Sequence, residues 1–215
     1  MLKIYGVYRS RATRPLWLLE EMNKEFELVP VIQAYRLPEP MAPDAATNTL
    51  SPEFLAVNPM GSIPSMEDDG FVLHESLAIT LYLARKYGGN LGPRDIAEEG
   101  LMVQWSLFAA TSIETAALKL QSTKDDTDEG KAEISVAART LKRPFDVLEK
   151  HLSANSHMAG GRFTVADLNV AEVVRYAQGH APLFDKRPAL KNWLEACQAR
   201  PGFKAMWDKR MAEPA

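Results

Sequence analysis

Glu75 and Ser76 are placed where they could bind an anion. They follow an apolar run and open an amphipathic pattern, so we expect both at the start of a helix. The free N–H groups and partial positive charge of a helix N-terminus bind carboxylates. A turn, a short strand and a hairpin precede the pair within residues 58–74. This segment is therefore suited to a small, peptide-like, anionic ligand, although helix capping alone is the other interpretation of the pair.

Ser10 is the second candidate for chemistry, because it follows the first expected strand and precedes the first expected helix. Its hydroxyl should lie at the C-terminal edge of the sheet, where ligands of α/β folds gather. A cap for the following helix is the alternative role of a serine in this position. Arg11 and Thr13 could replace or assist it, and Tyr5 and Tyr8 supply competing hydroxyl groups.

The elements expected over residues 1–87 have the order βαβαββα. Alternating apolar residues at the amino terminus predict a short strand, and Pro15 suits the first turn of the helix that follows. A second apolar strand covers residues 26–32. A hairpin turn at residues 68–70 joins two further strands ahead of the helix that Ser76 opens. This is the order of a thioredoxin-like α/β domain, in which a parallel βαβ unit joins an antiparallel hairpin.

Residues 33–51 interrupt this order with prolines and with small and polar residues that show no stable period. We expect a loop or a loose, partly helical excursion there. Because it is longer than most connections in compact domains, it is a candidate lid or a loop that borders a site.

A glycine-rich linker at residues 88–93 separates the first domain from residues 93–215, which we expect to form an all-α bundle. Apolar residues at spacings of three and four predict long helices over residues 99–120 and 134–152. Pro144 lies inside the second of these helices and should bend it or leave a gap in its hydrogen bonds.

Three further helix starts are expected in the second half. Thr164, with Asp167 three residues later, has the pattern of a capping box, so we expect a structural role for Asp167. Pro188 and Pro201 each suit the first turn of a helix.

The composition narrows the class of protein. The 215 residues are 46% hydrophobic and 25% charged, which is ordinary for a soluble globular protein. A net charge of −3 without a long basic block disfavours nucleic-acid binding. No apolar run approaches the roughly 18 residues of a membrane span, and no signal peptide is evident. With Cys197 as the single cysteine and four histidines that lack ligand spacing, we expect neither a CxxC redox pair nor a metal site.

The order of motifs in the first half resembles the glutathione-binding domain of the cytosolic glutathione transferases. The motifs are NPxGxIP over residues 58–64, Asp69-Gly70, and ESxAIxxYL from Glu75. The two-part layout extends the resemblance over essentially the whole chain, more weakly after residue 93. It implies a thioredoxin-like domain and a helical bundle that together conjugate the glutathione thiolate to small electrophilic, largely apolar compounds. The run from Ser10 is similar to the serine-type active site of bacterial-type members.

The resemblance implies a role for each residue of the glutathione site. Ser10 would donate a hydrogen bond to the sulfur and lower the thiol pKa, which is ordinarily about 8.5. A cis bond before Pro64 would present the backbone of Ile63 to the cysteinyl part of glutathione, like an added strand. Ser76 would hold the γ-glutamyl carboxylate and Glu75 the ammonium group. An ordinary proline at a strand start is the other interpretation of Pro64.

The glycyl end of glutathione has the weakest match. The family often places a basic or amide side chain just before the NP turn, where this chain has the apolar residues 54–57. Arg36 or Asn48 in the long loop could take that place, and Arg11 is a further candidate contact for glutathione.

The resemblance also implies a pocket for the second substrate, between Ser10 and the first helix of the bundle. Its candidates are Tyr8, Trp105, Phe108 and Ser112, and core packing is the other interpretation of the last three. Glutathione would be the co-substrate, and the small electrophile the other ligand. We expect a cytoplasmic homodimer with contacts through the third and fourth helices, and no metal, nucleic acid or membrane as a partner.

Two alternative functions remain open from the sequence. One is a glutathione-dependent reductase, peroxidase or isomerase of the same fold, although the lack of a cysteine near Ser10 argues against mixed-disulfide chemistry on a protein thiol. The other is a non-catalytic binding protein that kept the fold, which the apolar stretch before Asn58 would favour.

Overall fold

The computed structural model of the protein describes residues 1–214, and their contacts divide them into two units. The first unit combines Met1–Tyr87 with the segment that begins at Pro201, and the second is Gly88–Arg200. The break after Tyr87 falls just before the glycine-rich stretch that the sequence predicts as a linker. The segment that begins at Pro201, which the expected bundle over 93–215 includes, belongs to the first unit.

A four-stranded sheet with the order β2-β1-β3-β4 forms the centre of the first unit. β1 pairs in parallel with β2 and antiparallel with β3, and β3 pairs antiparallel with β4. Asp69 and Gly70 have φ angles of 50° and 86°, so the hairpin turn lies where the sequence predicted it. The strands span Leu2–Gly6 (β1), Glu27–Pro30 (β2), Ser65–Asp68 (β3) and Phe71–His74 (β4).

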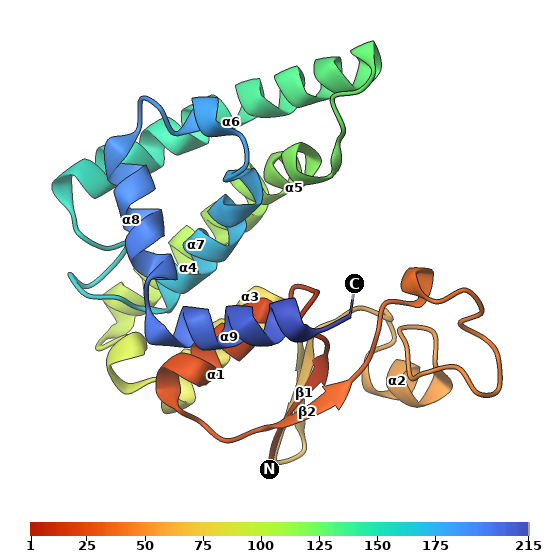
Figure 1. Ribbon diagram of the computed structural model, residues 1–215. Coiled ribbons are helices and arrows are strands. Elements are labelled where there is room, and N and C mark those ends of the chain that lie inside the picture. Colours follow the sequence, from red (N-terminus) through yellow and green to blue (C-terminus); the bar gives the residue numbers. More distant parts are fainter. Residues whose placement is uncertain (215) are drawn as a thin grey trace. The chain divides into compact units, whose positions relative to one another are not determined.

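Within residues 1–214, four helices accompany this sheet, and the first three of them confirm with it the predicted order βαβαββα. They span Thr13–Met22 (α1), Pro52–Val57 (α2), Ser76–Tyr87 (α3) and Pro201–Ala212 (α9). α9 runs beside α1, although the two helices come from opposite ends of the chain (Figure 1). Trp17 of α1 is fully buried and meets Phe203 of α9 edge-on, with ring centroids 5.0 Å apart. This aromatic contact fixes α9 on the first unit.

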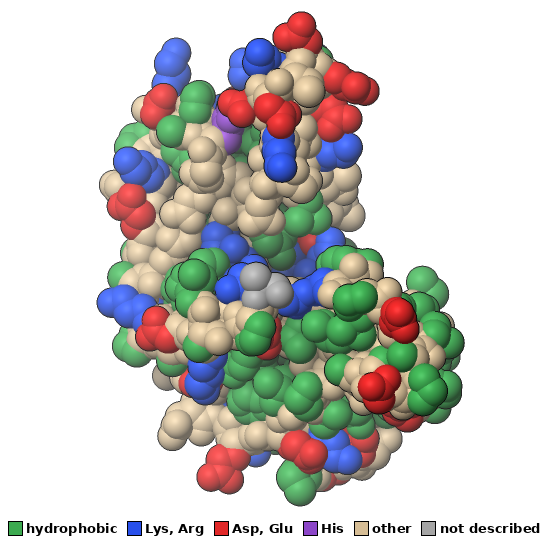
Figure 2. Space-filling view, turned by 45° about the vertical axis from the view of Figure 1, so that its right-hand side comes forward, with side chains coloured by type: hydrophobic (Ala, Val, Ile, Leu, Met, Phe, Trp, Pro, Cys, Tyr) green, Lys and Arg blue, Asp and Glu red, His purple; other side chains and the backbone are tan. Residues whose placement is uncertain are grey.

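The long loop over residues 33–51 is ordered mainly by one buried side chain. It contains a single 3₁₀ turn, Ala34–Arg36, as the partly helical interpretation allowed. Asn48 is 1% exposed, donates to the carbonyl of Pro40 (2.9 Å) and accepts from the N–H of Leu50 (2.9 Å). The outer side of this region carries exposed apolar side chains, seen as the green area at the lower right of Figure 2. The large exposed apolar residues of the loop are Tyr35, Met41 and Leu50, and Met60 follows α2.

The second unit is helical, as predicted. Its helices span Ile96–Phe108 (α4), Thr115–Ser122 (α5), Asp128–Ala154 (α6), Val165–Val174 (α7) and Pro188–Gln198 (α8). A wider π-type stretch over Ala109–Glu114 joins α4 to α5, so the predicted helix over 99–120 is continuous but not uniformly α. α6 continues past Pro144, and every residue of α7 is buried.

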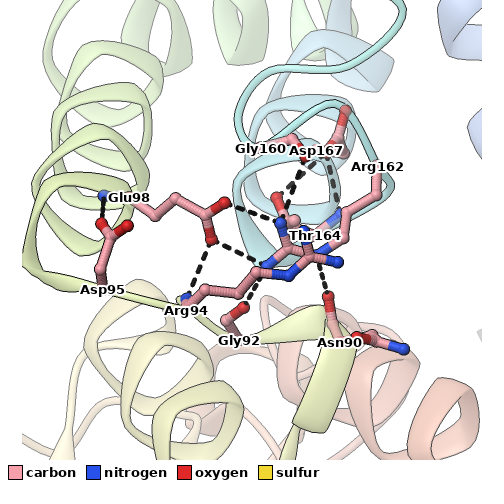
Figure 3. A network of polar contacts seen from close by, with 9 residues as sticks. All are labelled: Asn90, Gly92, Arg94, Asp95, Glu98, Gly160, Arg162, Thr164 and Asp167. Atoms are coloured by element: carbon pink, nitrogen blue, oxygen red, sulfur yellow. Dashed lines mark hydrogen bonds and ion pairs between the residues drawn. The ribbon is translucent and has the colours of Figure 1, made fainter.

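A charged network fastens the linker to the start of α4 and to the loop before α7 (Figure 3). Arg162 forms a bidentate pair with Glu98 at 2.8 Å for each bond, and donates to the carbonyls of Asn90 (2.8 Å) and Gly92 (2.7 Å). The hydrogen bonds that Glu98 accepts lower its pKa from 4.5 to about 2, with the Arg162 guanidinium as the main cause. The linker and two segments far apart in the chain are thereby tied together.

The start of α7 confirms the predicted capping box. The side chain of Asp167 accepts from the N–H of Thr164 (3.0 Å), and the Thr164 side chain and the N3 backbone complete the box. Asp167 also accepts from the N–H of Met158 (2.9 Å) and from the indole of Trp193 (3.0 Å). The aspartate is fully buried, so its role is structural, as expected.

Candidate functional site

Ser10 lies in the turn between β1 and α1, with its hydroxyl in two local hydrogen bonds. The hydroxyl donates to the carbonyl of Val7 (2.7 Å) and accepts from the N–H of Ala12 (3.0 Å). These bonds close the turn before α1 and do not cap the helix, whose N-cap residue is Ala12. Ser10 is only half-buried, however, so its hydroxyl can rotate toward a ligand. An ionised acceptor would favour that rotation, because charge-assisted hydrogen bonds are the stronger ones.

A second turn carries Ile63 and Pro64, and the peptide bond between them is cis, as the resemblance implied. The turn is organised by Asn58, whose side chain is 1% exposed. Its Nδ2 donates to the carbonyl of Ser62 (2.8 Å) and to the hydroxyl of Ser65 (3.0 Å). Within residues 1–214, the N–H and C=O of Ile63 form no backbone hydrogen bond. This peptide edge can therefore pair with a peptide-like ligand.

Gly6 allows the two turns to approach each other at the end of β1. A Cβ atom at this position would lie 3.1 Å from Cβ of Ala12 and 3.6 Å from Cβ of Ile63. The first distance is shorter than ordinary van der Waals contact. Glycine at this position therefore brings the segment after Ser10 and the turn with the cis bond to the same edge of the sheet.

The start of α3 completes the candidate site with a buried cation beneath a hydroxyl group. Ser76 is the first residue of α3 and is 5% exposed. Arg14, on α1 and 2% exposed, donates from Nη1 to Oγ of Ser76 (2.8 Å). Since the Ser76 oxygen accepts this bond, its hydroxyl proton can be donated to a ligand carboxylate. The Arg14 charge adds to the positive end of the α3 dipole.

Glu75 precedes α3 in a strained backbone conformation. Its φ angle is 67°, in the left-handed region that residues other than glycine seldom adopt. Its carbonyl accepts the N–H of Ile79 (2.9 Å), and its side chain is exposed. The carboxylate is therefore accessible for a ligand cation, and the strain at this residue is of the kind found at binding sites.

The competing hydroxyl groups are less suited to the role of Ser10. Tyr5 donates to Glu67 (2.9 Å), and burial and that carboxylate raise the pKa of Tyr5 to about 12. The hydroxyl of Thr13 is buried and donates to the carbonyl of Ser10 (3.2 Å). Tyr8 is 9% exposed, and burial raises the pKa of its phenol, which interacts with Lys209 of α9. This placement argues against the predicted role of Tyr8 in the second-substrate pocket.

The polar side chains predicted to bind the glycyl end of glutathione differ from one another in exposure and in hydrogen-bond partners. Arg36 is half-buried and donates to the side chain of Gln33 (3.2 Å) and to the carbonyl of Pro214 (3.0 Å). Arg11 is exposed in the same turn as Ser10. Asn48 uses its amide within the loop, so the structure does not support it as an anchor for a glycyl carboxylate.

The other second-substrate candidates belong to the helical unit. Trp105 is 7% exposed and packs against Phe108 and His151, with ring centroids 5.6 and 4.7 Å away, so core packing describes it. Phe108 and Ser112 are half-buried. Ser112 and Val136 line a cavity of about 550 Å³ in this unit.

The side chains and helices of residues 1–214 also bear on metal binding and on membrane insertion. No group of three or more His, Cys, Asp or Glu side chains in this range is arranged to hold a metal ion. None of the helices in the same range is long and apolar enough to cross a membrane.

Sequence reasoning missed the positions of two residues that shape the site. Arg14 lies beneath Ser76, which is a position that the sequence analysis does not predict. Asn58 was interpreted only as part of a turn, yet its amide holds that turn closed. The isolated position of Asn58 before a proline was a usable signal, because asparagine side chains often bond to nearby backbone in turns. Arg14 gave no such signal, since the bond joins two distant helices.

A thioredoxin-like domain with a serine after β1, a cis-proline turn and an open α3 N-terminus, followed by a helical domain, defines the class of cytosolic glutathione-dependent transferases. Residues 8–86 match the model of the glutathione S-transferase N-terminal domain, and residues 102–201 match that of the C-terminal domain. The chain belongs to the glutathione S-transferase family.

Individual relatives support this assignment over nearly the full length. Glutathione S-transferase 3 of Zea mays is 34% identical, with 94% of this chain and 91% of that protein covered. Glutathione S-transferase F13 of Arabidopsis thaliana is 32% identical, with 94% and 93% covered. The solved structure of glutathione S-transferase III in apo form is 31% identical, has a TM-score of 0.79, and covers 100% of this chain and 99% of that one. Glutathione transferase F7 from Populus trichocarpa is 29% identical with a TM-score of 0.80, at 98% and 99% coverage.

Proposed function

We propose that the protein transfers glutathione to small electrophilic, largely apolar compounds, with Ser10 as the residue that stabilises the thiolate. The observation that carries this proposal is that one unit of the protein contains three groups that can each form a hydrogen bond with a ligand. They are the half-buried hydroxyl of Ser10, the unpaired peptide edge of Ile63, and the hydroxyl of Ser76 above Arg14. Together they offer partners for the sulfur, the cysteinyl backbone and a carboxylate of one tripeptide.

In this proposal, Ser10 changes its hydrogen-bond partner when glutathione binds. The hydroxyl leaves the carbonyl of Val7 and donates to the sulfur, and the N–H of Ala12 continues to hold the Ser10 oxygen. The thiol proton goes to solvent, and the thiolate forms a C–S bond with the electrophilic carbon while a leaving group departs with its electron pair or a double bond accepts it. The stabilised thiolate and the close approach of the two reactants supply the rate enhancement.

The remaining contacts with glutathione follow from the same geometry. Ile63 pairs with the cysteinyl backbone beside Pro64, Ser76 and the first N–H groups of α3 hold the γ-glutamyl carboxylate, and Glu75 faces the ammonium group. Arg11 and Arg36 are the candidate contacts for the glycyl carboxylate. For the electrophile, Phe108 and Ser112 are the candidates that the helical unit leaves partly exposed.

The proposed assembly is a cytoplasmic homodimer. α4 carries apolar side chains on its outer face, since Val103 is 38% and Leu107 is 57% exposed. Single exposed apolar residues are common, but two at a spacing of four residues lie on one face of a helix and support an interface.

The test is a pH titration of the thiolate absorbance of glutathione bound to the wild type and to Ser10→Ala. We expect the thiol pKa to fall clearly below about 8.5 in the wild type and to return toward that value in the variant. A low pKa that Ser10→Ala leaves unchanged would overturn the role of Ser10. Binding without any lowering of the pKa would refute the catalytic proposal and favour a binding protein.

A further inference from the structure

The chain leaves α9 at Ala212 and then contacts the two residues that precede Ser10. The Glu213 carboxylate accepts the N–H of Tyr8 at Oε1 (2.9 Å) and the N–H of Arg9 at Oε2 (2.7 Å). Two successive backbone N–H groups thus share one carboxylate, with an oxygen for each. We call residues 210–214 the C-terminal strap.

Other hydrogen bonds fasten this strap to the same turn. The Arg9 side chain donates from Nε to the carbonyl of Glu213 (2.8 Å), and Arg210 donates from Nη1 to the carbonyl of Tyr8 (2.6 Å). Arg36 of the long loop donates to the carbonyl of Pro214 (3.0 Å). The strap and the turn belong to the same unit, so these contacts lie within one compact part of the molecule.

The strap determines the backbone orientation on which the Ser10 hydroxyl depends. The Tyr8 and Arg9 peptides lie between Val7, whose carbonyl accepts the Ser10 hydroxyl, and Ser10 itself. On its other side, Arg9 accepts at its carbonyl from the Gln33 side chain (3.1 Å). If Glu213 were removed, two N–H groups of this turn would lose their partners, and the turn could rotate. A misplacement of a reacting group by about 1 Å can cost about a hundredfold in rate.

We propose that Glu213 is a positioning residue for the transferase reaction, which holds the Tyr8–Arg9 backbone so that Ser10 presents its hydroxyl to the glutathione sulfur. This inference rests on the proposed role of Ser10. The role of Glu213 is geometric and not electrostatic, because a carboxylate close to the sulfur would disfavour the thiolate rather than stabilise it.

The experiment compares Glu213→Ala and Glu213→Gln with Asp208→Ala. Asp208 is an exposed acidic residue on α9, so its removal matches the change in charge without touching the turn. We expect Glu213→Ala to lower kcat about tenfold and to raise the pKa of the bound thiol, with little change in the KM for glutathione. Glu213→Gln, which keeps one acceptor oxygen, should lie between this variant and the wild type. Asp208→Ala should match the wild type.

Amide hydrogen exchange supplies a readout that does not depend on turnover. The N–H groups of Tyr8 and Arg9 should exchange faster in Glu213→Ala and Glu213→Gln than in the wild type, while the melting temperature of Glu213→Gln changes little. If Glu213→Ala fails to fold, Glu213→Gln alone decides the question.

Three outcomes would overturn the inference. A low thiol pKa and an unchanged kcat in the folded Glu213 variants would refute the positioning role and leave the role of Ser10 intact. A higher kcat in Glu213→Gln would show an electrostatic role instead. A wild type that does not lower the thiol pKa at all would refute the proposed function and this inference together.

Discussion

The Ser10 hydroxyl has a single proton, so it can donate to only one acceptor at a time. It donates to the Val7 carbonyl in this structure and would donate to sulfur when glutathione is bound. A serine that closes a turn is held near its working position before the ligand arrives, which reduces the entropy lost on binding. Closing this turn and donating to a ligand sulfur are therefore compatible for this residue.

Glu75 combines the carboxylate that we propose for the ammonium group of glutathione with a backbone conformation that suits glycine. We expect Glu75→Gly to raise the free energy of unfolding by about 1 kcal/mol, because the strain at a φ of 67° is relieved. The same change should weaken glutathione binding about tenfold, since the partner of the ammonium group is lost. Chemical denaturation and calorimetric titration measure the two effects.

Asn23→Gly is the matched control, because Asn23 also has a positive φ, 47°, but lies at the end of α1. It should leave the affinity for glutathione unchanged. Equal affinities of Glu75→Gly and the wild type would show that Glu75 does not contact the ligand.

At the scale of elements, the contact between β1 and the two turns depends on Gly6. In Gly6→Ala the new methyl group would lie 3.1 Å from Cβ of Ala12, so the strand and the turn must separate. We expect a loss of about 1 to 3 kcal/mol in unfolding free energy and a higher KM for glutathione. Gly100→Ala, in an open part of α4, should instead stabilise the protein by about 0.5 to 1 kcal/mol. A Gly6→Ala enzyme with wild-type KM would contradict the proposed site.

The Arg162–Glu98 pair predicts a pH dependence of stability in the helical unit. The pKa of Glu98 in the folded protein, about 2, lies below its ordinary 4.5. The stabilisation is therefore complete above about pH 5 and is lost as the pH falls toward 2. We expect Glu98→Gln to lower the free energy of unfolding by about 1 to 2 kcal/mol at neutral pH. The stability of this variant should also fall less steeply than that of the wild type as the pH is lowered. Urea unfolding at several pH values measures this, and Glu195→Gln, at an exposed residue of α8, is the control.

Most elements were predictable from the sequence because their signals are local. The hairpin at Asp69-Gly70, the capping box at Thr164 and the helix starts at Pro188 and Pro201 were each found where expected. The π-type stretch over 109–114 was not predicted, because its apolar spacing is close to that of an α-helix. The bond from Arg14 to Ser76 was not predicted either, since it depends on how two helices pack.

At the scale of the whole molecule, the sequence analysis places the last helix in the helical bundle, whereas in the structure it belongs to the first unit. Pro201 predicted the start of a helix correctly, but a start signal does not say which surface the helix will cover. The edge contact of Trp17 with Phe203 places α9 on the first unit. The strap contacts of Glu213 follow from that placement, and they were beyond the reach of sequence reasoning for the same reason.

The proposed homodimer predicts the effect of a charge on the outer face of α4. Leu107→Glu should dissociate the dimer, because a carboxylate would be buried in an apolar contact. Val147→Glu, at a side chain on α6 that is 41% exposed, should leave it intact. Sedimentation at several concentrations measures the assembly. Wild-type sedimentation of Leu107→Glu would place the interface elsewhere, and a monomeric wild type would refute the proposed assembly.

The return of α9 to the first unit has a consequence for how the protein matures on the ribosome. Domains generally fold as units while synthesis proceeds from the amino terminus. Here, the partner of Trp17 is translated after the whole of Gly88–Arg200. The side of α1 that packs against α9 therefore stays exposed in the nascent chain until the helical part has been synthesised. Glu213, which holds the Tyr8–Arg9 backbone beside Ser10, is likewise translated only after the helical part.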